Sequence, residues 1–289
     1  MVNKKITAKT QLCCLIGNPV SHSLSPEIHN TAFQALSLDF VYLAFRVENL
    51  KEAISGLRAL GNFKGASVTI PHKVEALKYL DEVDDVAKNI GSINTIINEK
   101  DKLIGYNSDG SGALKALISA GVNPDNKNIL IFGSGGAARS IAFTLAMKTK
   151  PASLTISGII ENELKNLVDD LNKKTQTVVK GMLLGNDSLT KSLKNCEVLI
   201  HCTPVGMHPK TSESIIPKGF INPDIAVFDI VYNPLKTRLL KEAEERNCKI
   251  IPGVEMFVNQ AVVQFQLWTG EEPPVEIMKK VVMENLKKK

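Results

Sequence analysis

Short apolar runs alternate with amphipathic segments along almost the whole chain. The runs Leu12–Ile16 and Ile129–Phe132 are continuously apolar, which is typical of parallel strands that are buried on both faces. Leu50–Leu60, in contrast, carries its apolar residues at helical spacing. An alternation of this kind predicts an α/β fold.

The first part of the chain contains signals for strands, helices and one hairpin. We expect strands at Leu12–Ile16, Val41–Phe45 and Gly65–Ile70, helices at Leu50–Leu60 and Ser108–Ala120, and a hairpin of Asn94–Asn98 and Leu103–Asn107. Ser25 precedes Pro26, a pair that is typical of an N-cap and a first helical residue. Another helix should therefore begin at Pro26. Gly121, Pro124 and Asp125 then mark a break in the chain.

A glycine-rich stretch follows this break. In Asn128–Ser140, N-I-L-I-F-G-S-G-G-A-A-R-S, a strand leads into a helix through Gly133, Gly135 and Ala138, which fit the spacing G-x-G-x-x-A. Such glycines permit a tight turn and let the backbone approach a pyrophosphate. Strands at Ser153–Ser157, Thr177–Met182, Val198–His201 and Ile225–Asp229 then alternate with helices at Glu161–Asn172 and Thr237–Arg246. This order predicts a doubly wound parallel sheet with a dinucleotide cradle.

The break before the glycine-rich stretch predicts two domains. We expect a substrate and catalytic domain over residues 1–110, completed by 254–289, and a dinucleotide-binding domain over 111–253. Two helical segments, Glu255–Thr269 and Val275–Leu286, come after the last expected strand. We predict that they return to the first domain.

Composition narrows the possible classes of protein. Among 289 residues, 44% are hydrophobic and 22% charged, values typical of a globular protein rather than a disordered chain or a fibre. The net charge of +5 is spread along the chain without a basic stripe interleaved with aromatics, so no nucleic-acid partner is expected. Neither a leader with an apolar core nor a membrane-spanning run is recognisable. Five cysteines without a C-x-x-C pair, and histidines without metal spacing, predict a cytoplasmic protein with neither disulfides nor a metal.

The loops of the first domain concentrate groups that can bind a polar ligand. The loop Gly17–Ser25 holds three serines, which could bind a carboxylate or simply form a capped turn. Thr69 and Lys73 lie just past a strand end, where α/β sheets place their ligands. Asp109 lies at a helix N-terminus, where an N-cap is the simpler interpretation. Together with a dinucleotide cradle, these groups indicate a redox enzyme with a cleft between its domains.

Eight motifs in order give this chain a resemblance to the shikimate dehydrogenase family from end to end. They are S-H-S-L-S-P, V-T-I-P-H-K, G-S-I-N-T, G-Y-N-S-D-G, G-S-G-G-A-A-R, T-P-V-G-M, Y-N-P-L-K-T and E-M-F-V-N-Q-A. The resemblance implies two α/β domains around a cleft. It also implies reversible reduction of 3-dehydroshikimate to shikimate with a nicotinamide cofactor, in the pathway to chorismate and the aromatic amino acids.

The resemblance also implies roles for individual residues. Lys73 and Asp109 match the catalytic pair, in which a protonated lysine supplies a proton and a positive charge to the developing alkoxide. Residues matching the substrate-binding positions are Ser23, Ser25, Ser67, Thr69, Asn94, Tyr232 and Gln260. Residues matching the cofactor-binding positions are Gly133, Ser134, Gly135, Gly136, Ala137, Thr203, Val205 and Gly253. His22 and His72 are expected to be loop scaffold.

Some positions depart from the family pattern. Ser67 replaces an asparagine that many members carry, Ser108 replaces a threonine, and His201 replaces the asparagine of the usual Asn-Ala-Thr. We expect His201 to be a core or loop histidine bonded to the backbone. At the end of the second nucleotide-domain strand, Gly158–Ile160 provides neither the arginine that binds the 2′-phosphate of NADP nor the acidic residue typical of NAD enzymes. Arg139 could partly compensate.

Several alternatives therefore stay open. The family favours NADP as the cofactor, with NAD as the alternative. A quinate/shikimate dehydrogenase that works with NAD in the catabolic direction is the second hypothesis, and a homologue that binds without catalysis is a remote third. Shikimate or 3-dehydroshikimate, and quinate in the second hypothesis, are the expected small-molecule partners. A monomer and a homodimer are equally compatible with the sequence, and so are both directions of the reaction.

Overall fold

The computed structural model describes residues 5–185 and 192–287. The chain folds into two compact units. The first comprises Met1–Ser108 together with Gln260–Lys289, and the second comprises Asp109–Asn259. Each unit contains its own sheet, so the α/β class predicted from the alternation is confirmed.

The sheet of the first unit is mixed. Its strands are β1 (Gln11–Gly17), β2 (Phe40–Arg46), β3 (Phe63–Val68), β4 (Glu82–Val83), β5 (Thr95–Glu99) and β6 (Lys102–Tyr106), in the order β2-β1-β3-β5-β6-β4. β1 runs parallel to β2 and β3, whereas β5 is antiparallel to both β3 and β6. The predicted hairpin is therefore confirmed as β5 and β6. Cys13 and Cys14 of β1 are fully buried on the two faces of this sheet, as expected of an interior strand.

The first unit also contains helices, and two of them begin at a capping side chain. They are α1 (Ser25–Ala35), α2 (Leu50–Arg58), a 3₁₀ helix (Glu75–Tyr79) and α3 (Asp85–Ile90). Asn49 caps α2 by accepting from the Glu52 N–H, and Asp84 caps α3. The prediction that Ser25 is an N-cap is wrong, because α1 begins at Ser25 and its hydroxyl bonds to Ser23 instead. The pattern also missed β4 and α3, both too short to show a period.

The second unit is a doubly wound parallel sheet. Its strands are β7 (Asn128–Phe132), β8 (Ser153–Gly158), β9 (Val179–Leu183), β10 (Val198–His201), β11 (Ala226–Asp229) and β12 (Lys249–Pro252), in the order β12-β11-β10-β7-β8-β9. All of these pairings are parallel. β7, the first of these strands along the chain, lies in the middle of the sheet. β8 and β9 follow on one side of β7, and β10, β11 and β12 follow on the other side. The predicted sheet is confirmed, although the short edge strand β12 was missed.

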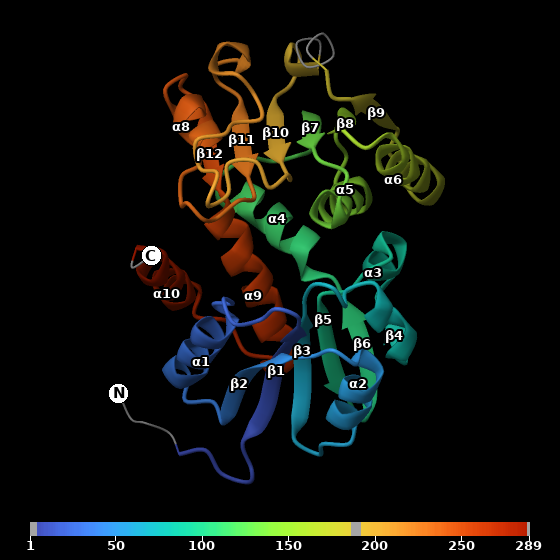
Figure 1. The fold of residues 1–289 in the computed structure, drawn as a ribbon, viewed down its shortest axis with the longest axis vertical. Helices are drawn as coiled ribbons and strands as arrows, with labels where there is room; N and C mark the ends of the chain where they lie inside the picture. The colour runs from blue at the N-terminus through green and yellow to red at the C-terminus, as the bar shows by residue number, and fades with distance from the viewer. Residues whose placement is uncertain (1–4, 186–191, 288–289) are drawn as a thin grey trace. The chain divides into compact units, whose positions relative to one another are not determined.

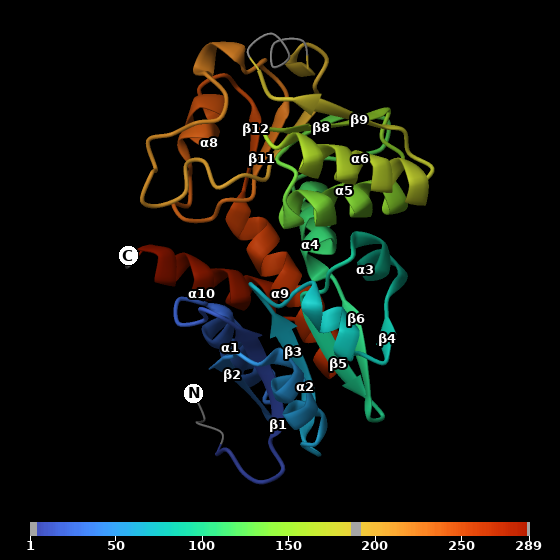
Figure 2. The same cartoon turned by 45° about the vertical axis from the view of Figure 1, so that its right-hand side comes forward.

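Helices flank this parallel sheet. They are α4 (Ser108–Ser119), α5 (Gly136–Lys148), α6 (Glu161–Lys174), α8 (Arg238–Glu244) and a 3₁₀ helix (Lys218–Phe220). α5 and α6 lie side by side, and α8 packs on β11 and β12 (Figure 2). Thr237 begins α8 as its N-cap, accepting from the Leu240 N–H. Between α8 and the sheet lies an apolar core that contains Leu199, Val227 and Leu239.

Two long helices end the chain, α9 (Gly253–Thr269) and α10 (Val275–Lys287). The part of α9 from Gln260 onward belongs to the first unit, where the indole N–H of Trp268 donates to the Ile96 carbonyl of β5 at 3.0 Å. α10 packs beside α1 and buries Met278 and Val282 (Figures 1 and 2). The predicted return of the C-terminal helices to the first domain is thus confirmed. Across the described ranges, no helix combines the length and the apolar character needed to span a bilayer.

Candidate active site

Two polar loops of the first unit lie together at the carboxyl ends of β1 and β3. The Asn18 N–H donates to the Ile70 carbonyl at 2.9 Å, and the Thr69 N–H donates to the Ile16 carbonyl at 3.0 Å. Gly17 permits this approach, because any side chain at that position would overlap the Thr69 methyl group. Ser23 lies on the first of these loops. The carboxyl ends of neighbouring parallel strands are where α/β sheets bind ligands.

The serine loop and the lysine turn are each fixed by local bonds. The Ser23 hydroxyl donates to Ser25 Oγ at 3.1 Å and accepts from the Ser25 N–H at 3.2 Å. His72 is buried, and its Nε2 lies 2.9 Å from the Val47 carbonyl oxygen. This contact agrees with the expected scaffold role of His72. The half-buried Lys73 follows it and accepts the Ile93 N–H at its carbonyl oxygen.

Asn94 is the centre of a buried set of hydrogen bonds. Its side-chain oxygen accepts from the Ser108 N–H at 2.8 Å and from the Thr95 hydroxyl at 2.7 Å. Its amide nitrogen donates to Ser108 Oγ at 3.0 Å, and Ser108 Oγ lies 3.5 Å from Gln260 Oε1. Asn94 and Gln260 are therefore brought together by Ser108, the first residue of α4.

Gln264 links this set to Ser67 and was not found by sequence reasoning. Its Oε1 accepts from the Ser67 hydroxyl at 3.0 Å, while its Nε2 donates to Thr95 Oγ1 at 3.0 Å and to the Asn94 carbonyl at 3.2 Å. Ser67 in turn accepts from the Tyr42 hydroxyl at 2.7 Å, and burial raises the pKa of Tyr42. An amide at a buried position of an otherwise apolar helix face was the signal that could have revealed Gln264.

The second unit presents the glycine turn at the point where its strand order reverses. Gly133, which follows the last residue of β7, has a φ of +112°, a conformation that other residues rarely adopt. Gly135 and Gly136 are exposed, with no atom within 4 Å of where a Cβ would be, and Gly135 caps α5 without a side-chain bond. Ser134 and Ala137 complete the turn. An open glycine turn at a helix N-terminus fits the pyrophosphate of a dinucleotide.

The strand end that contacts the adenosine ribose in such sheets is apolar here. Ile159 and Ile160 follow β8 and are 78% and 50% exposed. Ser134 Oγ lies 3.4 Å from Glu163 Oε2 of α6. The guanidinium of Arg139 instead bonds Asp170 at 2.5 Å and lies over the Phe143 ring, which argues against the partial compensation considered for Arg139.

His201 was expected to bond the backbone, but its ring bonds two side chains. Nδ1 lies 2.9 Å from Asp229 Oδ1, and Nε2 lies 2.5 Å from Thr203 Oγ1. The apolar run Val198–His201 gave no sign of these partners because Asp229 belongs to another strand. Thr203 also accepts from the Val205 N–H at 3.3 Å. Thr203 and Val205, both predicted cofactor residues, are therefore joined in one turn.

The remaining predicted residues of the second unit lie on α4, on α9 and after β11. Asp109 is the second residue of α4, so it is not the N-cap; the helix begins at Ser108, whose N–H is bonded by Asn94. Tyr232 stacks on Phe257 at 4.7 Å between ring centroids, and burial raises the pKa of Tyr232. Gly253 begins α9 against the Ile230 carbonyl, where any side chain would overlap.

Comparisons with known proteins identify the family. Residues 15–96 match the family model "Shikimate dehydrogenase substrate binding domain", and residues 253–283 match "Shikimate 5'-dehydrogenase C-terminal domain". The "Shikimate dehydrogenase (NADP(+))" of Methanocaldococcus jannaschii is 45% identical over 288 residues, covering 98% of this chain and all of that protein. The chain belongs to the shikimate dehydrogenase family.

Solved structures agree with this membership of the shikimate dehydrogenase family. A crystal structure of a shikimate dehydrogenase in complex with NADP+ is 40% identical, with a TM-score of 0.90 and 99% of both chains covered. The Listeria monocytogenes shikimate 5-dehydrogenase, solved with shikimate and NAD, is 35% identical with a TM-score of 0.93, covering 97% of this chain and 99% of that one.

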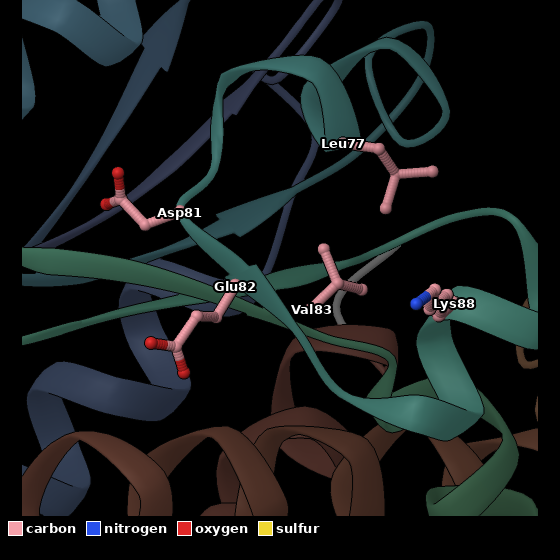
Figure 3. Close-up of a pocket in the computed structure, with 5 residues that line it drawn as sticks. All are labelled: Leu77, Asp81, Glu82, Val83 and Lys88. Atoms are coloured by element: carbon pink, nitrogen blue, oxygen red, sulfur yellow. The ribbon is translucent and has the colours of Figure 1, made fainter.

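This shikimate dehydrogenase family member also has a hollow near β4 that contains no predicted site residue. The hollow has a volume of about 530 Å³ and is lined by Leu77, Asp81, Glu82, Val83 and Lys88 (Figure 3). Asp81 bonds Arg58 and Glu82 bonds Lys102, at 2.6 and 2.7 Å. Since both carboxylates already have cationic partners, the hollow is no candidate for the active site. Within the part of the chain that the structure describes, no cluster of three His, Cys, Asp or Glu side chains could hold a metal ion.

Proposed function

We propose that the protein is an NADP-dependent shikimate dehydrogenase that catalyses the reversible reduction of 3-dehydroshikimate to shikimate, in the pathway to chorismate. The observation that carries this proposal is the near full-length match, at 45% identity, to proteins named for that activity. The polar loops at the strand ends of one sheet and the open glycine turn in the other support it independently.

The substrate is a carboxylate with several ring hydroxyls, and the first unit offers suitable partners. We assign the hydroxyls of Ser23 and Ser25 to the carboxylate, because they are already paired and share one loop. Thr69, Asn94 and Gln260 are assigned to the ring hydroxyls. Ser67 and, from the second unit, Tyr232 complete the proposed substrate-binding set.

The chemical step requires a proton as well as a hydride. The reduced nicotinamide, when bound, supplies the hydride to the ketone carbon. The electron pair of the broken C=O π bond then moves to oxygen, and the Lys73 ammonium donates a proton there, which produces the hydroxyl group. The lysine's positive charge also stabilises the developing alkoxide. Asp109 is the second member of the proposed catalytic pair, since a carboxylate favours the protonated form of lysine.

The cofactor-binding residues lie at the carboxyl edge of the parallel sheet. We propose that Gly133, Ser134, Gly135, Gly136 and Ala137 receive the pyrophosphate through backbone N–H groups, and that Thr203, Val205 and Gly253 lie at the nicotinamide end. NADP is proposed because the relatives' names specify it. NAD is the alternative, since the exposed Ile159 and Ile160 offer no cation to a 2′-phosphate.

The cellular setting is proposed on the same basis. All five cysteines are free thiols, which supports a reducing compartment such as the cytoplasm. A monomer or a homodimer is proposed, with substrate and cofactor as small-molecule partners.

A spectrophotometric assay tests the proposed function. The purified protein is mixed with shikimate or quinate, each with NADP+ or NAD+, and the absorbance of the reduced nicotinamide is followed. Turnover on shikimate, faster with NADP+, is the expected result. Faster turnover on quinate with NAD+ would assign the protein to the catabolic alternative, and no turnover in any combination would contradict the proposal.

A further inference from the structure

Three side chains at the ends of two neighbouring strands form a buried hydrogen-bonded chain. His201 ends β10 and lies opposite Asp229, the last residue of β11. The side chain of His201 is 1% exposed and that of Asp229 is fully buried. The imidazole connects the Asp229 carboxylate, at 2.9 Å, to the Thr203 hydroxyl, at 2.5 Å.

The donors and acceptors of this chain can be assigned from its far end. Asp229 accepts from the Val231 N–H at 3.0 Å and from the Thr237 hydroxyl at 2.6 Å, the pattern of an ionised carboxylate. A carboxylate only accepts, so His201 Nδ1 carries a proton. At the other end of the ring, Nε2 lies 2.5 Å from Thr203 Oγ1, which also accepts from the Val205 N–H.

The hydrogen-bonded chain of Asp229, His201 and Thr203 ends beside the glycine turn. β10 pairs with β7, and His201 lies opposite Phe132, the residue before Gly133. The Cys202 N–H donates to the Phe132 carbonyl at 2.7 Å. A Cβ added to Gly133 would come within 3.0 Å of the Cys202 carbonyl oxygen and 3.3 Å of the Thr203 methyl carbon. Thr203 thus packs directly on the turn at the reversal of the strand order, where dinucleotides bind in such sheets.

We propose that His201 is a positioning residue that, anchored by Asp229, fixes the turn from Thr203 to Val205 against the glycine turn. This inference rests on the proposed function, because it assigns the fixed turn to the cofactor. Both ring nitrogens of His201 are used within the protein, so His201 acts through Thr203 and not on the substrate.

The substitution His201→Asn tests the proposal with little risk to the fold. An asparagine amide can occupy the position of Nδ1 and keep the bond to Asp229, but it is too short to reach Thr203. The KM for the nicotinamide cofactor should rise about five-fold, the size expected for one net hydrogen bond. The kcat and the KM for shikimate should change less than about two-fold. Thr203→Val should have the same effect, and the double variant should be no worse than either single variant.

Thr144→Val is the matched control. Thr144 lies on α5 in the same unit, and its buried hydroxyl has no hydrogen-bond partner among the described residues, so the same substitution should leave both KM values unchanged. Amide hydrogen exchange of Val205 in the protein without ligand gives a readout independent of activity. Exchange should be about five-fold faster in His201→Asn and Thr203→Val than in wild type and Thr144→Val.

Either of two results would overturn the positioning role of His201 alone. Val205 exchange at the wild-type rate in both variants would show that the chain does not fix the turn. Faster exchange with unchanged cofactor affinity, measured by titration calorimetry with NADP+ and NAD+, would show that the turn does not serve the cofactor. A wild-type protein that binds neither cofactor would overturn the proposed function as well, whereas normal binding by wild type and variants alike would overturn only the positioning role.

Discussion

The buried amide of Gln264 should contribute measurably to the stability of the first unit. It makes three hydrogen bonds, to the Ser67 hydroxyl, the Thr95 hydroxyl and the Asn94 carbonyl. Gln264→Leu keeps a similar volume and removes all three. Each partner retains at least one other bond, to Tyr42, to the Asn94 side chain and to the Val68 N–H respectively. Each lost bond should therefore lower the free energy of unfolding by about 1 kcal/mol, which gives a total decrease of roughly 3 kcal/mol.

The fluorescence of Trp268 allows this decrease in the free energy of unfolding to be measured. It is the single tryptophan of the chain, and it is buried in the first unit. Urea unfolding followed by tryptophan fluorescence therefore reports on that unit, and a loss of this size should lower the midpoint by roughly 1–2 M. Gln266→Leu, two residues along the same helix but exposed, is the control and should change the unfolding free energy by less than about 0.5 kcal/mol. A loss below about 1 kcal/mol for Gln264→Leu would refute the reasoning.

Further predictions concern the catalytic lysine, the cofactor and acid stability. Lys73→Ala should lower kcat at least about 100-fold in the shikimate assay and change the KM for shikimate far less; nearly intact turnover would exclude Lys73 as the proton donor. Replacing Gly158-Ile159 by Asn-Arg should shift the ratio of kcat/KM values toward NADP, and an unchanged ratio would mean that the 2′-phosphate is recognised elsewhere. Burial lowers the pKa of His29 from 6.5 to about 3. As the pH falls below about 6.5, His29 therefore becomes protonated in the unfolded chain, whereas in the folded unit it stays neutral until about pH 3. Between about pH 6.5 and pH 3, the free energy of unfolding should decrease as the pH is lowered, by up to about 1.4 kcal/mol per pH unit. Urea midpoints should therefore decrease less steeply with falling pH for His29→Phe than for wild type, and parallel curves would contradict this.

Features with local causes could be predicted from the sequence. The glycine turn at Gly133, the parallel strands around it and the hairpin of β5 and β6 follow from patterns within a few residues. The capping prediction at Ser25 failed because the helix begins one residue earlier than the Ser-Pro pair indicates, with Leu24 in the cap position and the Ser25 hydroxyl accepting from Ser23. Elements as short as β4 contain too few residues to show a hydrophobic period.

Partners brought together by the fold could not be predicted. The bond between His201 and Asp229 joins residues 28 positions apart, and that between Gln264 and Ser67 joins residues 197 apart. Their meeting depends on strand order and on the return of α9 to the first sheet. No spacing rule gives that information, so the sequence could suggest polar groups for the site but not which of them bond to one another.

The two cysteines buried in β1 have a consequence for handling the protein. Burial raises the pKa of Cys14 to about 12 and that of Cys13 well above its ordinary value, so thiolate is scarce in both at neutral pH. The thiolate is the nucleophile that reacts with alkylating reagents and with peroxide, and therefore these side chains should be modified only when the sheet opens. The rate at which a thiol reagent labels Cys13 and Cys14 therefore measures how often this sheet opens, and no engineered probe is needed.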